Sequence, residues 1–123
     1  MNSSPLTILL FATGLPVHGY DFSLHSLAER QAMLAELYAT PGIAITDGPA
    51  VRYVEVEEEG AIWLVTQPGH LAHPSLLKRT LVSEQGARAI RVTGYTAAPP
   101  ALMSQWVEML RTQDEHMRGS ALS

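Results

Sequence analysis

The sequence predicts an α+β domain, in which a four-stranded antiparallel meander carries an N-terminal and a C-terminal helix packed on one face. Three observations support this prediction. Apolar residues recur at helical spacing towards both ends of the chain, alternating apolar runs of strand length fill its middle, and short turn sequences separate those runs. Short connections favour antiparallel pairing of consecutive strands, and two amphipathic helices can then cover one face of the sheet.

The first helix is expected from Ser26 or Leu27 to about Ala39. Ser26 and Glu29 have the spacing of a capping box, in which two side chains satisfy exposed backbone N–H groups at the helix start. The run Thr40-Pro41-Gly42 should end the helix. The expected apolar face consists of Leu27, Leu34, Leu37 and Tyr38.

The four strands of the meander are expected at residues 51–56, 61–66, 76–83 and 87–95. Residues 61–66 are apolar on both faces, which is typical of a central strand. The segment Glu57-Glu58-Glu59-Gly60 is interpreted as a hairpin turn, because glycine adopts the positive φ that such turns need. Consecutive carboxylates at a hairpin tip indicate a solvated, edge-protecting cluster rather than a cation site.

The second helix is expected from the prolines at 99 and 100, which suit the first helical positions, to about Gln113. Its apolar stripe is predicted to consist of Leu102, Trp106, Met109 and Leu110. Residues 114–123 are polar and are expected to form a frayed tail. Between Ala39 and the first strand, residues 43–45 are expected to be a short extended piece, and residues 16–21 a turn-rich link.

The composition limits the classes of function. The 123 residues suit one domain, predicted at 20–123, with 46% hydrophobic and 16% charged residues and a net charge of −4. Because no basic run occurs, we expect no nucleic-acid partner and no electrostatic membrane anchor. The chain has no cysteine, which excludes a thiol nucleophile, a zinc ribbon and a disulfide framework.

The apolar run from Leu6 to Leu15 is too short to span a bilayer as a helix, so we expect no transmembrane anchor. It fits the apolar region of a secretory signal, and residues 1–19 are therefore interpreted as a signal peptide or an N-terminal apolar segment. Cleavage would follow Gly14 or Gly19, where a small residue stands at the last position. No Lys or Arg precedes the run, and the alternative is a buried strand in a cytoplasmic protein.

The segment from Gln67 to Ser75 is the candidate site. His70 and His73 lie three residues apart in Gly-His-Leu-Ala-His-Pro, a spacing that can direct two imidazoles at one metal ion. Zinc needs at least one further ligand, and no spacing ties another residue to this pair. The alternative that we favour is a rigid connector, in which prolines restrict the backbone and the histidines cap backbone carbonyls.

An enzymatic reading has less support. His70 or His73 could act as a general base, but no Gly-x-Ser-x-Gly elbow, phosphate-binding glycine loop or dinucleotide fingerprint occurs, so no cofactor is expected apart from zinc at the histidine pair. Arg79 and Arg91 are candidate anion ligands, provided that strand pairing brings them together.

The segment Trp63-Leu-Val-Thr-Gln-Pro-Gly-His-Leu-Ala-His-Pro74, followed by Lys78-Arg79, resembles a pattern of small uncharacterised bacterial exported proteins. In that pattern a strand with Trp ends in Thr, a Gly-His-Pro-Ala-His-Pro turn follows, and a basic pair stands on the next strand. Leu71 occupies the position of the first proline of that turn. The resemblance implies a periplasmic or secreted location and no mechanism.

Together these observations predict a small exported binding or accessory protein that contacts a small ligand or a protein through residues 67–75 and the adjoining sheet face. One alternative is a metal-dependent or hydrolase-like enzyme that uses His70 and His73. The other is a structural or assembly role through a sheet edge.

Overall fold

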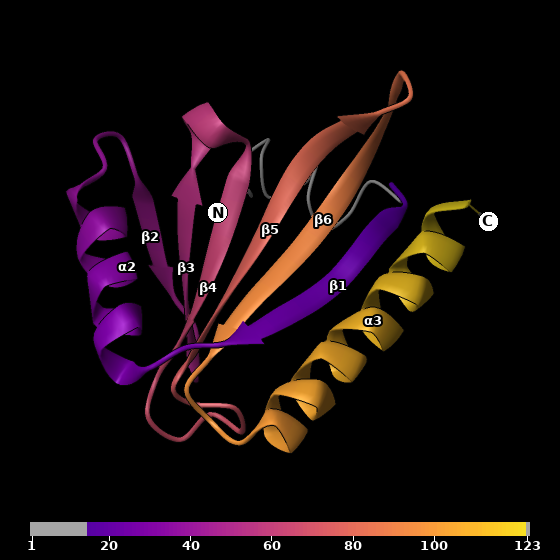
Figure 1. Cartoon of the computed structure of the whole chain (residues 1–123). Helices are drawn as coiled ribbons and strands as arrows, with labels where there is room; N and C mark the ends of the chain where they lie inside the picture. Colours follow the sequence, from indigo (N-terminus) through magenta and orange to yellow (C-terminus); the bar gives the residue numbers. More distant parts are fainter. Residues whose placement is uncertain (1–14, 123) are drawn as a thin grey trace.

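Six strands form one mixed, curled sheet, and two helices pack on it (Figure 1). The computed structural model describes residues 15–122. The strand order is β1-β6-β5-β4-β3-β2, with β1 parallel to β6 and every other neighbouring pair antiparallel. The elements are β1 Val17–Leu24, α2 Leu27–Ala39, β2 Ala44–Asp47, β3 Val51–Val56, the 3-10 turn η1 Glu57–Glu59, β4 Ala61–Thr66, β5 Ser75–Glu84, β6 Ala87–Thr96 and α3 Pro100–Leu122.

The prediction of a four-stranded antiparallel meander is wrong, although β3 to β6 do form the predicted hairpins. β2 extends the sheet at one edge, and β1 extends it at the other by pairing in parallel with β6. The predicted turn-rich link at 16–21 is therefore the first part of β1. Its residues have weak strand propensity, which the pairing with β6 overrides. The sequence did not predict this strand, because backbone hydrogen bonds to a strand far along the chain leave no signal in the local sequence.

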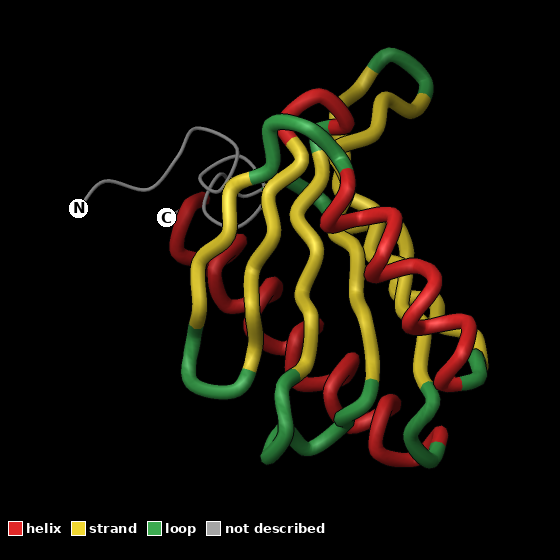
Figure 2. Tube along the Cα trace, turned by 90° about the vertical axis from the view of Figure 1, so that its left-hand side faces the viewer, coloured by secondary structure: helices red, strands yellow, loops and turns green. Residues whose placement is uncertain are grey.

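The prediction that both helices cover one face of the sheet is also wrong. The sheet has an apolar cluster on each face. β4 contributes to both clusters, because its successive side chains point to opposite faces. Leu37 of α2 packs in a cluster with Val65, and Trp106 of α3 packs in a cluster with Leu64. Figure 2 shows the strands lying between the two helices. The buried residues of the α2 cluster are Leu37, Val54, Val56, Val65 and Leu76; those of the α3 cluster are Ile62, Leu64, Ala72, Leu77, Ile90, Val92, Met103, Trp106, Val107 and Leu110.

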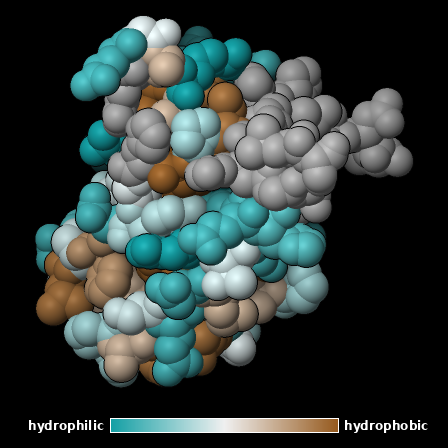
Figure 3. Space-filling model, turned by 90° about the vertical axis from the view of Figure 1, so that its right-hand side faces the viewer, coloured by the Kyte–Doolittle hydropathy of each residue, from teal (hydrophilic) through white to brown (hydrophobic). Residues whose placement is uncertain are grey.

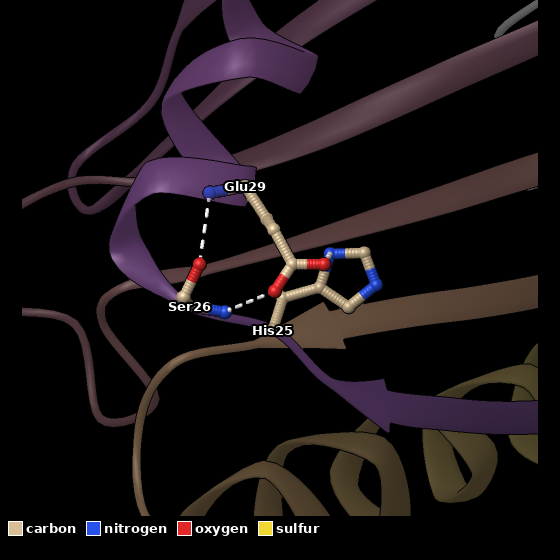
Figure 4. A network of polar contacts seen from close by, with 3 residues as sticks. All are labelled: His25, Ser26 and Glu29. Carbon is tan, nitrogen blue, oxygen red and sulfur yellow. Dashed lines mark hydrogen bonds and ion pairs between the residues drawn. The ribbon is translucent and has the colours of Figure 1, made fainter.

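The start of α2 confirms the predicted capping box (Figure 4). The backbone N–H of Glu29 donates to the Ser26 hydroxyl, and the backbone N–H of Ser26 donates to the Glu29 carboxylate, each across 3.0 Å. The Ser26 backbone N–H, and then the Ser26 side chain, lower the pKa of the Glu29 carboxyl by hydrogen bonding to it. His25 lies beside this cap, with its Nδ1 atom 3.9 Å from Glu29.

The helix α3 continues to Leu122, so the predicted frayed tail after Gln113 is wrong. Its buried side chains include Met103 and Val107, whereas Met109, which was predicted to lie on the apolar stripe, is 58% exposed. Asp114 explains part of the extra length, because its carboxylate binds the sheet residue Arg79. Within residues 15–122, no helix combines the length and the apolar character needed to cross a membrane.

Candidate functional site

The loop of residues 67–74 joins β4 to β5 at one end of the sheet, and its backbone is bonded at both of its ends. The N–H of Gln67 donates to the carbonyl of Ala50 across 2.9 Å, and the carbonyl of Pro74 accepts from Ala97 across 3.0 Å. Between them, Gly69 adopts a φ of 99°, which few other residues tolerate. The His73–Pro74 peptide bond is cis. The loop thus follows a defined path between two strands.

A buried row of hydroxyls underlies the loop where β4, β5 and β6 lie side by side. The Thr66 hydroxyl accepts from the Ser75 N–H across 2.8 Å and donates to the Ser75 carbonyl across 3.0 Å. The Ser75 hydroxyl donates to the carbonyl of Ala72 and lies 2.6 Å from the Thr96 hydroxyl. Ser75 is fully buried and its hydroxyl is occupied, so it does not present a nucleophile to solvent.

His73 lies above this row, with its Nδ1 atom 2.9 Å from the Thr66 hydroxyl oxygen. Because the Thr66 hydroxyl proton is directed at Ser75, the bonding pattern assigns the Nδ1–H tautomer, in which His73 donates. Arg30 of α2 donates to the Thr66 carbonyl across 3.0 Å, so the guanidinium and the imidazole meet at one residue. Burial, and then the charge of Arg30, lower the pKa of His73.

His70 is held differently, because its Nδ1 atom accepts the backbone N–H of Ala72 across 2.9 Å. Its ring lies against Trp106 of α3, with the centroids 4.5 Å apart and the planes at 71°. Burial, and then the neighbouring His73, lower the pKa of His70. Both imidazoles therefore favour the neutral form at neutral pH, and both bond within the protein.

These hydrogen bonds limit which nitrogen atoms of the predicted metal pair, His70 and His73, can bind a metal. The Nδ1 atoms of His70 and His73 are both engaged in protein hydrogen bonds, which leaves only the Nε2 atoms for a metal. No group of three or more His, Cys, Asp or Glu residues that could hold a metal ion occurs in the part of the chain that the structure describes. Zinc sites take at least three protein ligands, so the metal pair at His70 and His73 stays a prediction.

The sheet separates the two candidate arginines. Arg79 pairs with Val92 and Arg91 pairs with Thr80, so the two guanidinium groups leave opposite faces of the sheet. Arg79 is 1% exposed and lies under α3, where its Nη1 atom is 2.9 Å from Asp114. Arg91 is exposed on the other face. A single anion cannot contact both side chains.

Sequence reasoning missed the polar cluster beneath α3. The Tyr20 hydroxyl donates to the same Asp114 oxygen that binds Arg79, and the Arg111 guanidinium lies 5.0 Å from the centre of the Tyr20 ring. Burial and the Asp114 carboxylate raise the pKa of the Tyr20 phenol. A cavity of about 190 Å³ adjoins this cluster and is lined by Val17, Tyr20, Arg111, Asp114 and Glu115. The signal was available, because Asp114 follows the buried Leu110 by four residues on the helix.

Exposed apolar side chains accompany the loop. Leu71 is 42% exposed, and Leu24 and Leu27 are exposed where β1 passes into α2. Leu24 pairs with Thr96, which contacts Ser75, so these leucines lie at the same end of the sheet as the loop. We call residues 67–74 together with Leu24 and Leu27 the loop end. Figure 3, which views the molecule from the side of α3, shows hydrophilic side chains across the middle, with hydrophobic side chains both in the lower part and in the upper half.

Comparisons with models of protein families, with curated proteins and with solved structures found no match.

Proposed function

We propose that this chain is a small exported binding or accessory protein that contacts its partner through the loop end. One observation carries the proposal: the loop bonds its histidines and its backbone to its own scaffold while the Leu71 side chain remains 42% exposed. Leu71 shares this end of the sheet with the exposed Leu24 and Leu27, and exposed apolar side chains are candidates for an interaction surface. A loop that is already ordered loses little conformational entropy when a partner binds, which favours binding.

The contacts support binding over hydrolysis. Hydrolytic use of Ser75 would need an accessible hydroxyl, whereas this hydroxyl is buried and bonded to Ala72 and Thr96. His70 is less suited to act as a general base, because its Nδ1 atom already accepts the Ala72 N–H and its proton then lies on Nε2. The partner that suits the loop end offers an apolar group to Leu71, with a protein favoured over a small polar ligand.

A pair of matched substitutions tests this proposal and separates it from assembly through a sheet edge. Leu71→Asp is expected to weaken partner binding at least about tenfold, because loss of a buried leucine costs about 1.5–3 kcal/mol. Ile45→Asp changes a side chain of similar exposure, 48%, on the edge strand β2, and is expected to leave binding unchanged. Binding is measured by cross-linking and mass spectrometry in an extract of the cells in which the protein occurs.

Equal capture by wild type and Leu71→Asp would contradict the loop end as the binding surface. Loss of capture only in Ile45→Asp would instead support assembly through the edge strand β2. Both variants should retain wild-type stability within about 0.5 kcal/mol in urea melts, since both changes are at the surface.

Export is the second part of the proposal, and the fold favours one cleavage point. The apolar run Leu6 to Leu15 lies outside the described residues except for Leu15, which packs with Val17 against the α3 cluster. β1 begins at Val17, so the boundary at residue 20 cuts into this strand. Cleavage after Gly19 would remove Val17, which pairs with Ile90, whereas cleavage after Gly14 would leave β1 whole.

We therefore expect a mature protein that begins at Leu15. The full chain is expressed in a bacterium, and the intact mass of the periplasmic protein is determined by mass spectrometry. Gly14→Leu serves as the control and should block processing, because cleavage requires a small residue at that position. Recovery of an unprocessed cytoplasmic protein that begins at Met1 or Asn2 would contradict export.

A further inference from the structure

We propose that the loop of residues 67–74 is a pH-sensitive latch, which is closed while His70 and His73 are neutral and opens when they take up protons. The latch is built from the hydrogen bonds of the two Nδ1 atoms and from the placement of Arg30 against Thr66.

His70 supplies the directional part of the latch. Its Nδ1 atom accepts the backbone N–H of Ala72 across 2.9 Å, and only an unprotonated nitrogen can do so. An imidazolium carries N–H groups at both nitrogens. After protonation, the His70 Nδ1–H and the Ala72 N–H are therefore both donors, and the hydrogen bond between them is lost. Ala72 is fully buried, and its N–H then lacks an acceptor unless the loop moves.

His73 supplies the electrostatic part. Its Nδ1–H bond to the Thr66 hydroxyl survives protonation, but the added charge faces the Arg30 guanidinium, which donates to the Thr66 carbonyl across 3.0 Å. Arg30 from α2 and the other imidazole are the charged or titratable groups that act on these rings; α3 contributes Trp106 and β4 contributes Thr66. Among the described residues, no ion pair joins either ring to a carboxylate.

The lowered pKa values of His70 and His73 decide in which direction the loop responds to pH. Burial lowers the pKa of both imidazoles from the ordinary value of 6.5, so the closed loop binds fewer protons than an open loop. The closed state is therefore fully favoured above pH 6.5 and is lost as the pH falls below it. For each histidine, the opening equilibrium rises by up to about tenfold per pH unit within this window.

Opening would change the binding surface, because Leu71 is the neighbour of both His70 and Ala72. Release of a partner at acid pH rests on the proposed function, whereas opening of the loop does not. Hydrogen exchange tests the opening alone, without any partner.

The experiment follows the amide hydrogens of Ala72 and His73 by NMR-detected exchange in the full chain from pH 7.5 to pH 5, after correction for the intrinsic pH dependence. We expect the protection of both amides to fall in wild type as the pH drops below 6.5, by up to about tenfold per pH unit for each histidine. In the double variant His70→Asn, His73→Asn it should stay constant, because asparagine offers a non-titrating oxygen and N–H near the position of Nδ1. His116→Asn, at an exposed site on α3, is the matched control and should keep the wild-type response.

Constant protection in wild type would overturn the latch, as would an equal loss in the double variant. Imidazole titration by NMR in wild type gives a second reading that needs no substitution. A midpoint of 6.5 or higher for both rings would also overturn the proposal. If the latch responds as expected while Leu71→Asp has no effect on partner capture, the loop opening stands and the proposed binding surface fails.

Discussion

Replacing Trp106 by alanine is expected to lower the free energy of unfolding by about 3–5 kcal/mol. The indole is 5% exposed, and it packs with Leu64 and Leu77 in the cluster beneath α3. It also contacts the ring of His70, so the substitution should loosen the loop as well as the core. The loss is measured by urea denaturation, with the slope of the transition compared between variants.

Met109→Ala on the same helix is the matched control. Met109 is 58% exposed, and its truncation should cost no more than about 0.5 kcal/mol. A loss below about 1 kcal/mol for Trp106→Ala would contradict the packing of α3 against the sheet.

Asp114→Ala is the second substitution with a large expected effect, again about 3–5 kcal/mol. The Arg79 guanidinium is 2.9 Å from this carboxylate and its side chain is 2% exposed, so the variant leaves a buried charge without its carboxylate. The Tyr20 hydroxyl loses its acceptor in the same change. Stability is again measured by urea denaturation.

The double variant Arg79→Met, Asp114→Leu should lose less stability than the sum of the losses in the single variants Arg79→Met and Asp114→Leu, because it removes both charges together. Glu108→Ala is the control on the same helix: Glu108 forms an exposed pair with Arg111 across 3.7 Å, and its loss should cost less than about 1 kcal/mol. Equal losses for Asp114→Ala and Glu108→Ala would show that Arg79 does not depend on this carboxylate.

The register of the β5–β6 hairpin shows what could have been read from the sequence about the arginines. Its two-residue turn, Gln85-Gly86, has positive φ values of 51° and 80° and pairs Glu84 with Ala87. Counting outwards from that pair sets Arg79 opposite Val92, and therefore on the face away from Arg91. The placement of Arg79 and Arg91 on opposite faces could be predicted from the position of the turn, but the burial of Arg79 depended on the packing of α3.

The sequence located the loop of residues 67–74 but not the residues that hold it in place. The sequence identified the loop and its two histidines, because prolines, glycine and histidines gather there. It did not identify Arg30, Thr66 or Ser75 as their partners, since these come from α2 and from two strand ends. Hydrogen bonds between residues far apart in the chain follow from the packing of elements and have no local signature.

The sequence by itself determined those elements whose signals are local. The capping box at Ser26, the stop after Ala39 and the turn at Gly60, with its φ of 61°, each depend on neighbouring residues alone, and each lies where it was predicted. Only the tertiary structure decided that β1 pairs in parallel with β6, that α2 and α3 take opposite faces of the sheet, and that Asp114 closes over Arg79. The physical reason is that β4 is apolar on both faces and so accepts a helix on either side, and the choice depends on the burial of the whole chain.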